Sequence, residues 1–305
     1  MAKNDGWRPT LLPRLRLRFK KILYRLSPAL LYRLRFRLRT GRWPRLKHPR
    51  TFDEKLAFLM LYWRHPLMTQ CTDKYGLRAY VQEQKLGHLL PELIGVYEDS
   101  RELDFAALPG SFVLKCTHGW RFNILCRDKR QLSVQDARRQ LDAWMKTDFS
   151  IVFGESHYAA IRPRIICEPL LAAAAGGLPI DYKLYCFSGK VNCVMICLER
   201  SADGERARHF FVDRDWKRVL PYSRSTMNDD RPLPKVEGYE EMVAAAEILS
   251  RPFPFVRIDF YSINGRAVIG EMTFTPSAGI DPDFSELAQF ELGRLIILPP
   301  AGRNG

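Results

Sequence analysis

The sequence lacks any apolar run that approaches the roughly eighteen residues an α-helix needs to cross a bilayer. Its N-terminus also lacks the uninterrupted apolar segment and small-residue cleavage site of a signal peptide. These two absences predict a protein that stays inside the cell. Paired cysteine motifs are also absent: the seven cysteines are an odd number and show no CxxC spacing. This pattern favours reduced thiols over a disulfide framework or a zinc site.

Acidic residues are nearly missing from the first fifty positions, which hold twelve arginines and four lysines but one acid, Asp5. This segment carries +15 while the whole chain carries +14, which leaves −1 on residues 51–305. The basicity therefore belongs to an N-terminal arm, residues 1–50, and the rest is nearly neutral. The two parts need separate explanations.

The arm mixes basic and large apolar residues from position 11 to position 39, and Pro13 and Pro28 divide it. Read as two helices, it has apolar sides formed by Leu15, Phe19, Leu23 and Leu26, and then by Leu31, Leu34 and Leu38.

Basic amphipathic helices bind the headgroup layer of anionic membranes. We therefore expect residues 11–39 to hold the protein on the inner face of the membrane, as a peripheral cytoplasmic protein. Two other interpretations stay open: helices that pack on the body of the protein, and an arginine-rich arm that binds nucleic acid. Phosphate binding does not need so many large apolar residues, so no nucleic-acid partner is expected. The strict alternation around residues 33–39 would also suit a strand.

The body has the pattern of an α+β protein. A capping box at Thr51–Glu54 predicts the start of a helix. Further helices are predicted over residues 72–84, 133–146 and 239–250, and strands over residues 112–116, 123–127, 164–171, 182–187, 191–198, 255–261 and 266–274. We expect two α+β lobes, residues 51–171 and residues 172–305.

The last two predicted strands form a hairpin that carries two carboxylates, Asp259 and Glu271. A two-residue Asn-Gly turn would put them on opposite faces, whereas a three-residue turn with Gly265 left-handed pairs Ser262 with Arg266 and gives them one face. We expect the three-residue turn. Two acidic oxygen ligands with open positions then suit Mg²⁺ bound together with nucleotide phosphates, although solvated carboxylates on an exposed sheet remain the alternative.

From about residue 44 to residue 298, several segments occur in an order that resembles the ATP-grasp superfamily, and specifically its TupA-like branch. They are Thr51-Phe-Asp-Glu-Lys55, Thr72-Asp-Lys-Tyr75, Phe112-Val-Leu-Lys-Cys-Thr-His-Gly119, Asp181-Tyr-Lys183, Gly189-Lys190, Phe253-Pro-Phe-Val-Arg-Ile-Asp259 and Gly270-Glu-Met-Thr-Phe-Thr-Pro276. The resemblance implies an ATP-grasp fold, with ATP and Mg²⁺ held between the two lobes.

The resemblance also implies roles for single positions. Lys74 and Lys115 resemble the lysines that neutralise phosphate charge, and Glu168 resembles the residue at the adenine hinge. The other positions implied to contact the nucleotide are His118, Gly119, Arg121 and Asn123. Asp259, Glu271 and Thr273 resemble the metal ligands, and Lys183 and Arg257 resemble the catalytic cations near the γ-phosphate or an acyl phosphate.

This chain departs from the family pattern at two places. Thr273 stands where many ATP-grasp enzymes have a metal-binding Asn. The family usually reads His-Gly-Ser-Gly in its phosphate loop, and this chain has Trp120 and Arg121 in the last two of those positions. Glycine lets backbone N–H groups approach phosphate, so these residues either change the closure of the loop or replace backbone donors by a guanidinium.

The function expected from the resemblance is ATP-dependent joining of a carboxylate to an amine through an acyl phosphate. The substrates would be glycan or lipid-linked and would belong to surface polysaccharide biosynthesis, in keeping with the basic arm. One alternative is a kinase of a sugar or lipid hydroxyl that uses the same site. Another is a catalytically reduced, membrane-bound interaction protein whose phosphate loop no longer supports turnover.

Overall fold

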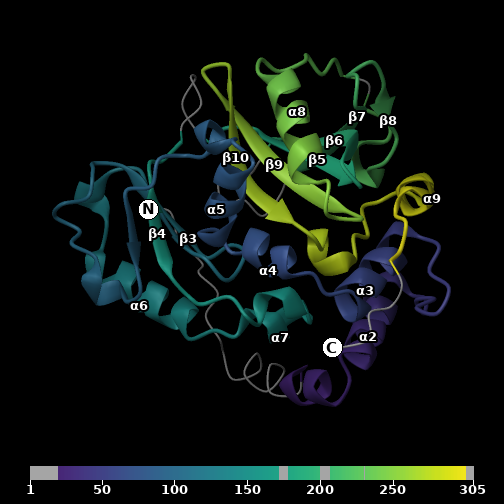
Figure 1. The fold of residues 1–305 in the computed structure, drawn as a ribbon, viewed down its shortest axis with the longest axis horizontal. Helices are drawn as coiled ribbons and strands as arrows, with labels where there is room; N and C mark the ends of the chain where they lie inside the picture. The colour runs from purple at the N-terminus through teal and green to yellow at the C-terminus, as the bar shows by residue number, and fades with distance from the viewer. Residues whose placement is uncertain (1–19, 172–177, 200–206, 230, 300–305) are drawn as a thin grey trace.

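The computed structural model describes residues 20–171, 178–199, 207–229 and 231–299, and it contains two antiparallel sheets (Figure 1). The four-stranded sheet has the order β1-β4-β2-β3, with strands β1 (Gly95–Tyr97), β2 (Phe112–Cys116), β3 (Asn123–Cys126) and β4 (Ile165–Glu168). The six-stranded sheet has the order β10-β9-β5-β6-β7-β8, with strands β5 (Asp181–Phe187), β6 (Lys190–Leu198), β7 (Arg208–Asp213), β8 (Val219–Leu220), β9 (Val256–Ile263) and β10 (Arg266–Thr273).

Helices flank both sheets. The α-helices with described bounds are α2 (Pro28–Thr40), α3 (Phe52–Tyr62), α4 (Pro66–Thr72), α5 (Gly76–Glu83), α6 (Val134–Met145), α7 (Phe149–Phe153), α8 (Tyr239–Leu249) and α9 (Glu286–Leu295). Short 3₁₀ turns are η1 (Gly87–Leu89), η2 (Ser100–Glu102), η3 (Lys129–Gln131), η4 (Ser156–Tyr158), η5 (Arg224–Thr226) and η6 (Pro276–Gly279). The predicted α+β class is confirmed.

The helix starts follow local sequence signals. At α3 the capping box forms as predicted, since the Thr51 hydroxyl accepts from the Glu54 N–H and the Glu54 carboxylate accepts from the Thr51 N–H. The helix predicted over residues 72–84 is wrong at its start, because α4 ends at Thr72 and α5 begins at Gly76. Between them the Asp73 carboxylate accepts from the Tyr75 N–H, which replaces a helical hydrogen bond by a local turn.

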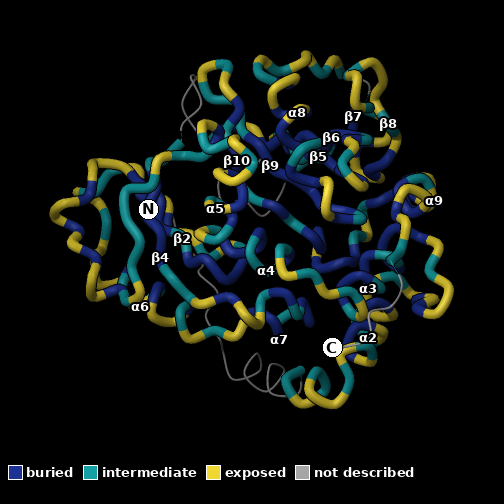
Figure 2. Tube along the Cα trace, in the orientation of Figure 1, coloured by how far each residue is buried: buried dark blue, intermediate teal, exposed yellow. Residues whose placement is uncertain are grey.

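The core is divided between the two sheets (Figure 2). One face of the six-stranded sheet packs against α8, α4 and α5, and its other face packs against α3 and α9. The four-stranded sheet packs against α6. Helices that precede the four-stranded sheet in sequence therefore pack on the six-stranded sheet, and α4 and α5 lie between the two (Figure 1). The lobe division at residues 171 and 172 stays a prediction.

The described part of the arm is helical over residues 20–26 and in α2, while residues 11–19 lie outside the described residues. α2 packs on the body through Leu31, Tyr32 and Phe36, and the Tyr32 hydroxyl donates to the Gly279 carbonyl at 2.8 Å. The predicted apolar side is thus partly wrong, because Leu38 is 85% exposed. The side that enters the core is the one that meets α3 and η6. Among the described residues no helix is both long enough and apolar enough to cross a membrane.

The three-residue turn expected in the β9–β10 hairpin is wrong. Arg266 pairs with Ile263 across a two-residue turn in which Asn264 and Gly265 have φ of 51° and 76°, because two left-handed residues match the twist of the strands. A β-bulge between Ile269 and Glu271 then adds one residue to β10.

The bulge returns Glu271 to the position directly opposite Asp259, so the two carboxylates do share a face. Gly270 occupies the extra position. A Cβ there would lie 3.0 Å from the Tyr261 ring and 3.3 Å from the Asp259 carbonyl oxygen, so the close approach of the two strands favours glycine.

The contact between α9 and the start of α3 also depends on a glycine. A Cβ at Gly293 would lie 2.5 Å from the Arg50 carbonyl oxygen and 2.9 Å from the Phe52 nitrogen, and neither backbone atom can move aside cheaply. We expect Gly293→Ala to lower the free energy of unfolding by about 1–2 kcal/mol, even though alanine is the better helix former. Urea denaturation measures this loss. Gly110→Ala is the control, because a Cβ there meets nothing within 4 Å; equal losses in both variants would contradict the prediction.

Candidate active site

The four-stranded sheet contributes an ion pair between adjacent strands. The Lys115 ammonium on β2 lies 2.7 Å from the Glu168 carboxylate on β4, and the Arg78 guanidinium of α5 lies 3.2 Å from the other carboxylate oxygen. Glu168 is 4% exposed. A buried carboxylate must be paired, and here two cations from different elements pair it.

The six-stranded sheet contributes a second charged group centred on Asp259 of β9. The Arg257 guanidinium bonds both carboxylate oxygens of Asp259, at 2.6 and 2.7 Å, and the Lys183 ammonium of β5 bonds one of them. Asp181 lies 3.2 Å from the same ammonium. Burial raises the pKa of Asp259, and the two cations oppose that shift. The carboxylate is therefore held in place by charge from its own strand and from a neighbouring strand.

Glu271 of β10 is the accessible carboxylate of the pair. Its side chain is 37% exposed, whereas that of Asp259 is 3% exposed. Its Oε1 accepts from the Thr273 hydroxyl at 3.2 Å and from the Arg257 guanidinium at 3.3 Å. Burial acts to raise the pKa of Glu271, but Lys74, Arg257 and Lys183 outweigh it, so this pKa lies below its ordinary value. An ionised, accessible carboxylate is suited to binding a cation.

Lys74 connects the two sheets. It lies in the break between α4 and α5, where its N–H donates to the Thr117 carbonyl at 3.3 Å and its ammonium donates to the Gly119 carbonyl at 2.5 Å. Burial lowers the pKa of Lys74; the negative charge of Glu271 opposes this shift, and the positive charge of Lys115 adds to it. Lys74 therefore bonds the loop of the four-stranded sheet and interacts electrostatically with Glu271 of the six-stranded sheet.

The loop between β2 and β3, residues 117–122, is the predicted phosphate loop. A Cβ at Gly119 would lie 2.8 Å from the Phe122 and Phe149 rings, so no larger residue fits there. The next-but-one residue, Arg121, has a φ of 62°, a left-handed conformation that suits glycine. The side chains of Arg121 and Asn123 are exposed at the loop surface.

His118 does not join the other predicted site residues. Its ring is buried beneath the loop, with Nε2 3.0 Å from the Trp144 carbonyl oxygen and the ring edge against Phe122. In this position it supports the loop from the core of the four-stranded sheet. Burial lowers the pKa of His118, which favours the neutral ring.

Two residues at the site were not predicted from the sequence, Arg78 and Asp181. Arg78 follows Lys74 by four residues, a spacing that suggests a shared face on the helix we expected there. Asp181 precedes Lys183 by two residues on one strand, which places both side chains on the same face. Both spacings could therefore have identified these two residues from the sequence.

Comparison with known proteins identifies the family. Residues 54–297 match the sequence profile of the family described as TupA-like ATPgrasp. The chain belongs to the TupA-like ATP-grasp family. The predicted resemblance is confirmed.

Solved structures of ATP-grasp ligases are also similar to this chain. They include the ligase PsnB with a minimal precursor (16% identity, TM-score 0.38, 69% of this chain and 54% of that one). The L-amino acid ligase from Bacillus licheniformis (14%, 0.43, 69% and 44%) and the D-alanine–D-alanine ligase from Bacillus anthracis with ATP (13%, 0.45, 74% and 64%) are further examples. The chain thus spans less than two thirds of the length of these proteins. No curated protein matches the sequence.

ATP and Mg²⁺ are the cofactors of ATP-grasp ligases, and the residues of this family member fit both. Within the described residues no three His, Cys, Asp or Glu side chains gather as a protein-only metal cage. Asp259 and Glu271 instead lie opposite each other, with the Thr273 hydroxyl beside Glu271, and they place two carboxylates and one hydroxyl on one face. Such an incomplete oxygen set is typical of Mg²⁺ that is also bound by nucleotide phosphates.

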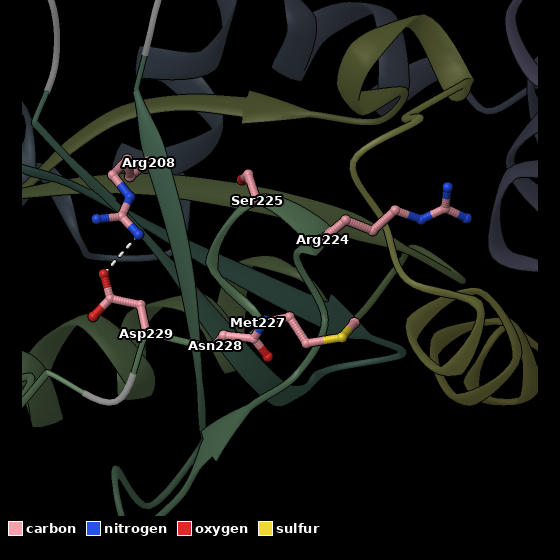
Figure 3. Close-up of a pocket in the computed structure, with 6 residues that line it drawn as sticks. All are labelled: Arg208, Arg224, Ser225, Met227, Asn228 and Asp229. Carbon is pink, nitrogen blue, oxygen red and sulfur yellow. Dashed lines mark ion pairs between the residues drawn. The ribbon is translucent and has the colours of Figure 1, made fainter.

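A separate surface pocket of about 290 Å³ lies beside β7 and η5. Arg208 lines it but is paired with Asp229 at 2.6 Å, and the Arg224 side chain extends away from that pair (Figure 3). The pocket therefore offers no converging charge for a nucleotide.

The metal assignment can be tested by removing one carboxylate charge at a time. We expect Glu271→Gln and Asp259→Asn each to weaken the binding of a non-hydrolysable ATP analogue with Mg²⁺ by about tenfold or more, or about 1.4 kcal/mol. Isothermal titration with and without Mg²⁺ measures this effect. Glu271→Gln is the cleaner variant because Asp259→Asn leaves two buried cations underpaired. Glu240→Gln, on the exposed face of α8, is the control; unchanged Mg²⁺-dependent affinity in both site variants would refute the assignment.

Proposed function

We propose that this protein is an ATP-dependent carboxylate–amine ligase that works through an acyl phosphate. One observation carries the proposal: two carboxylates lie directly opposite each other on β9 and β10, where Arg257 and Lys183 pair with them and the positive charge of Lys74 acts on Glu271. In phosphoryl transfer most of the catalysis comes from positioning the phosphates and stabilising their charge. This arrangement supplies both.

Each group in the site has a role in this proposal. Asp259 and Glu271 would hold Mg²⁺, with Thr273 beside them, and the metal would neutralise phosphate charge. Lys74 and Lys115 neutralise the phosphates from the side of the four-stranded sheet, with Arg121, Gly119 and Asn123 of the loop above them.

Lys183 and Arg257 are the proposed catalytic cations. Both are bonded to Asp259. Their positive charges would stabilise a phosphoryl group transferred beside Asp259. The substrate carboxylate oxygen attacks the γ-phosphorus of ATP and ADP leaves; the amine then attacks the acyl carbon and inorganic phosphate leaves.

We further propose that the substrates are glycan or lipid-linked units of surface polysaccharide biosynthesis, used at the cytoplasmic face of an anionic membrane. The support is the arm. Its described residues expose Ile22, Leu26, Leu30 and Leu38 together with arginines. Apolar side chains beside cations suit a headgroup layer.

The reaction is tested by following phosphate. With candidate pairs of carboxylate and amine, we expect inorganic phosphate release only when both are present, together with an amide product of the summed mass less water. Phosphorus NMR and mass spectrometry report the two quantities. Phosphate that stays on the acceptor would mean a kinase and would contradict the ligase proposal, and release that needs no amine would contradict it as well.

Membrane binding is tested with exposed residues only, because deletion of the arm would also remove Tyr32 and Phe36 from the core. We expect the double variant Arg33→Gln, Arg37→Gln to bind anionic liposomes about thirtyfold more weakly in a flotation assay. Each basic residue near the membrane surface contributes about 1 kcal/mol of binding free energy. Added salt should reduce it further. Arg139→Gln, exposed on α6, is the matched control. Equal flotation of all variants, or flotation with neutral liposomes alone, would contradict the membrane proposal.

A further inference from the structure

The short segment formed by α7 and η4, residues 149–158, contacts three parts of the molecule that are far apart in sequence. It touches the arm, the phosphate loop and the chain that follows β10. In Figure 1, α7 lies beneath the two lobes, between α6 and α2. Its contacts show how the arm and the nucleotide site are joined.

On the arm side, the cations of two helices meet the C-terminal end of α7. The Arg35 guanidinium of α2 donates to the Phe153 carbonyl and lies 5.3 Å from the centre of the Phe153 ring. The Lys20 ammonium lies 3.4 Å from the Val152 carbonyl oxygen and 5.8 Å from the same ring. Cations at free carbonyls of a helix C-terminus and over an aromatic face are both favourable. Phe153 is therefore positioned by the arm.

On the loop side, Trp120 packs on the same ring. Its indole stacks on Phe153 with ring centres 5.1 Å apart and planes at 26°, and it meets Phe149 edge-on at 5.9 Å. Phe122 at the far end of the loop stacks on Trp144 at 5.3 Å. Aromatic pairs in such arrangements contribute about 0.5–1.5 kcal/mol each beyond their buried area. The middle and the C-terminal end of the loop are thus fixed by aromatic contacts.

A third contact joins the segment to the chain beyond β10. The Glu155 carboxylate is 2% exposed and accepts from the Thr275 hydroxyl. Burial raises the pKa of Glu155 to about 7, against the influence of Thr275, Arg35 and Trp120. This hydrogen bond therefore joins the segment to the chain that follows β10.

We propose that Trp120 is a positioning residue of the phosphate loop, and that Arg35 of the arm controls the order of that loop through Phe153. The left-handed Arg121 beside Trp120 costs about 1–2 kcal/mol without a glycine, so the loop needs outside support to keep this conformation. Trp120 supplies that support. Loss of the Arg35 contact with Phe153 would loosen the loop.

The proposal is first tested without nucleotide, by hydrogen exchange of the amides of residues 117–123 in the full chain. We expect Arg35→Met and Trp120→Ala each to speed this exchange about tenfold or more, and Trp120→Phe to stay near wild type because it keeps an aromatic stack. Arg33→Met is the matched control, since it removes the same charge from an exposed position of the same helix. Unchanged exchange in Arg35→Met would overturn the proposal.

The second measurement is the affinity for the ATP analogue with Mg²⁺, and this part rests on the proposed function. We expect Arg35→Met and Trp120→Ala each to weaken binding about tenfold, and the double variant to be no weaker than the weaker single variant, because both act through Phe153. Multiplicative losses in the double variant would overturn the proposal. Wild-type protein that binds no nucleotide would refute the proposed function instead, and the exchange measurement would still decide whether the arm orders the loop.

Discussion

The burial of Asp259 is the constraint on which the rest of the site depends. Taking a carboxylate out of water costs several kcal/mol unless good partners replace the lost hydration. Asp259 finds them in Arg257, two residues away on its own strand, and in Lys183, which lies directly opposite on β5. Glu271 lies directly opposite on β10, so one row across three strands reads lysine, aspartate, glutamate. A slip of one residue in either pairing would turn part of this row into the apolar core, which fixes the register of all three strands.

The hairpin shows how far sequence can predict such a row. The Asn-Gly pair specifies a two-residue turn, and that turn alone would separate Asp259 from Glu271. The bulge at Gly270 corrects the separation, but a bulge depends on how closely Tyr261 and the Asp259 backbone approach, which are contacts across strands. The chemistry of a metal site favours two carboxylates on one face, and Asp259 and Glu271 do share a face. The turn predicted to produce this arrangement was wrong. Chemistry was therefore a better guide here than turn geometry.

Signals that act within a few residues were predicted well, and those that need distant partners were not. The Thr51–Glu54 capping box and the strand at residues 112–116 are local, and both form. The buried side of α2 depends on distant partners, because the Tyr32 hydroxyl donates to the carbonyls of Asp53 and Gly279. The same holds for His118, which sequence places among nucleotide ligands and the structure places against the Trp144 carbonyl. The role of a residue that is implied by the family pattern alone therefore also depends on the residues that surround it in the fold.

The departure of the loop from the glycine pattern is best understood with the arm. The serine and glycine of the family pattern would leave the loop free to close on phosphate but would give α7 no aromatic ring to contact. Trp120 instead restricts the loop by packing on Phe153, which Arg35 of the arm also contacts. The strained backbone at Arg121 is then stabilised from outside the loop, and its guanidinium stays exposed where backbone donors would otherwise be. The same ring of Phe153 thus contacts a cation of the basic arm and an aromatic residue of the loop, which is the observed connection between the two parts.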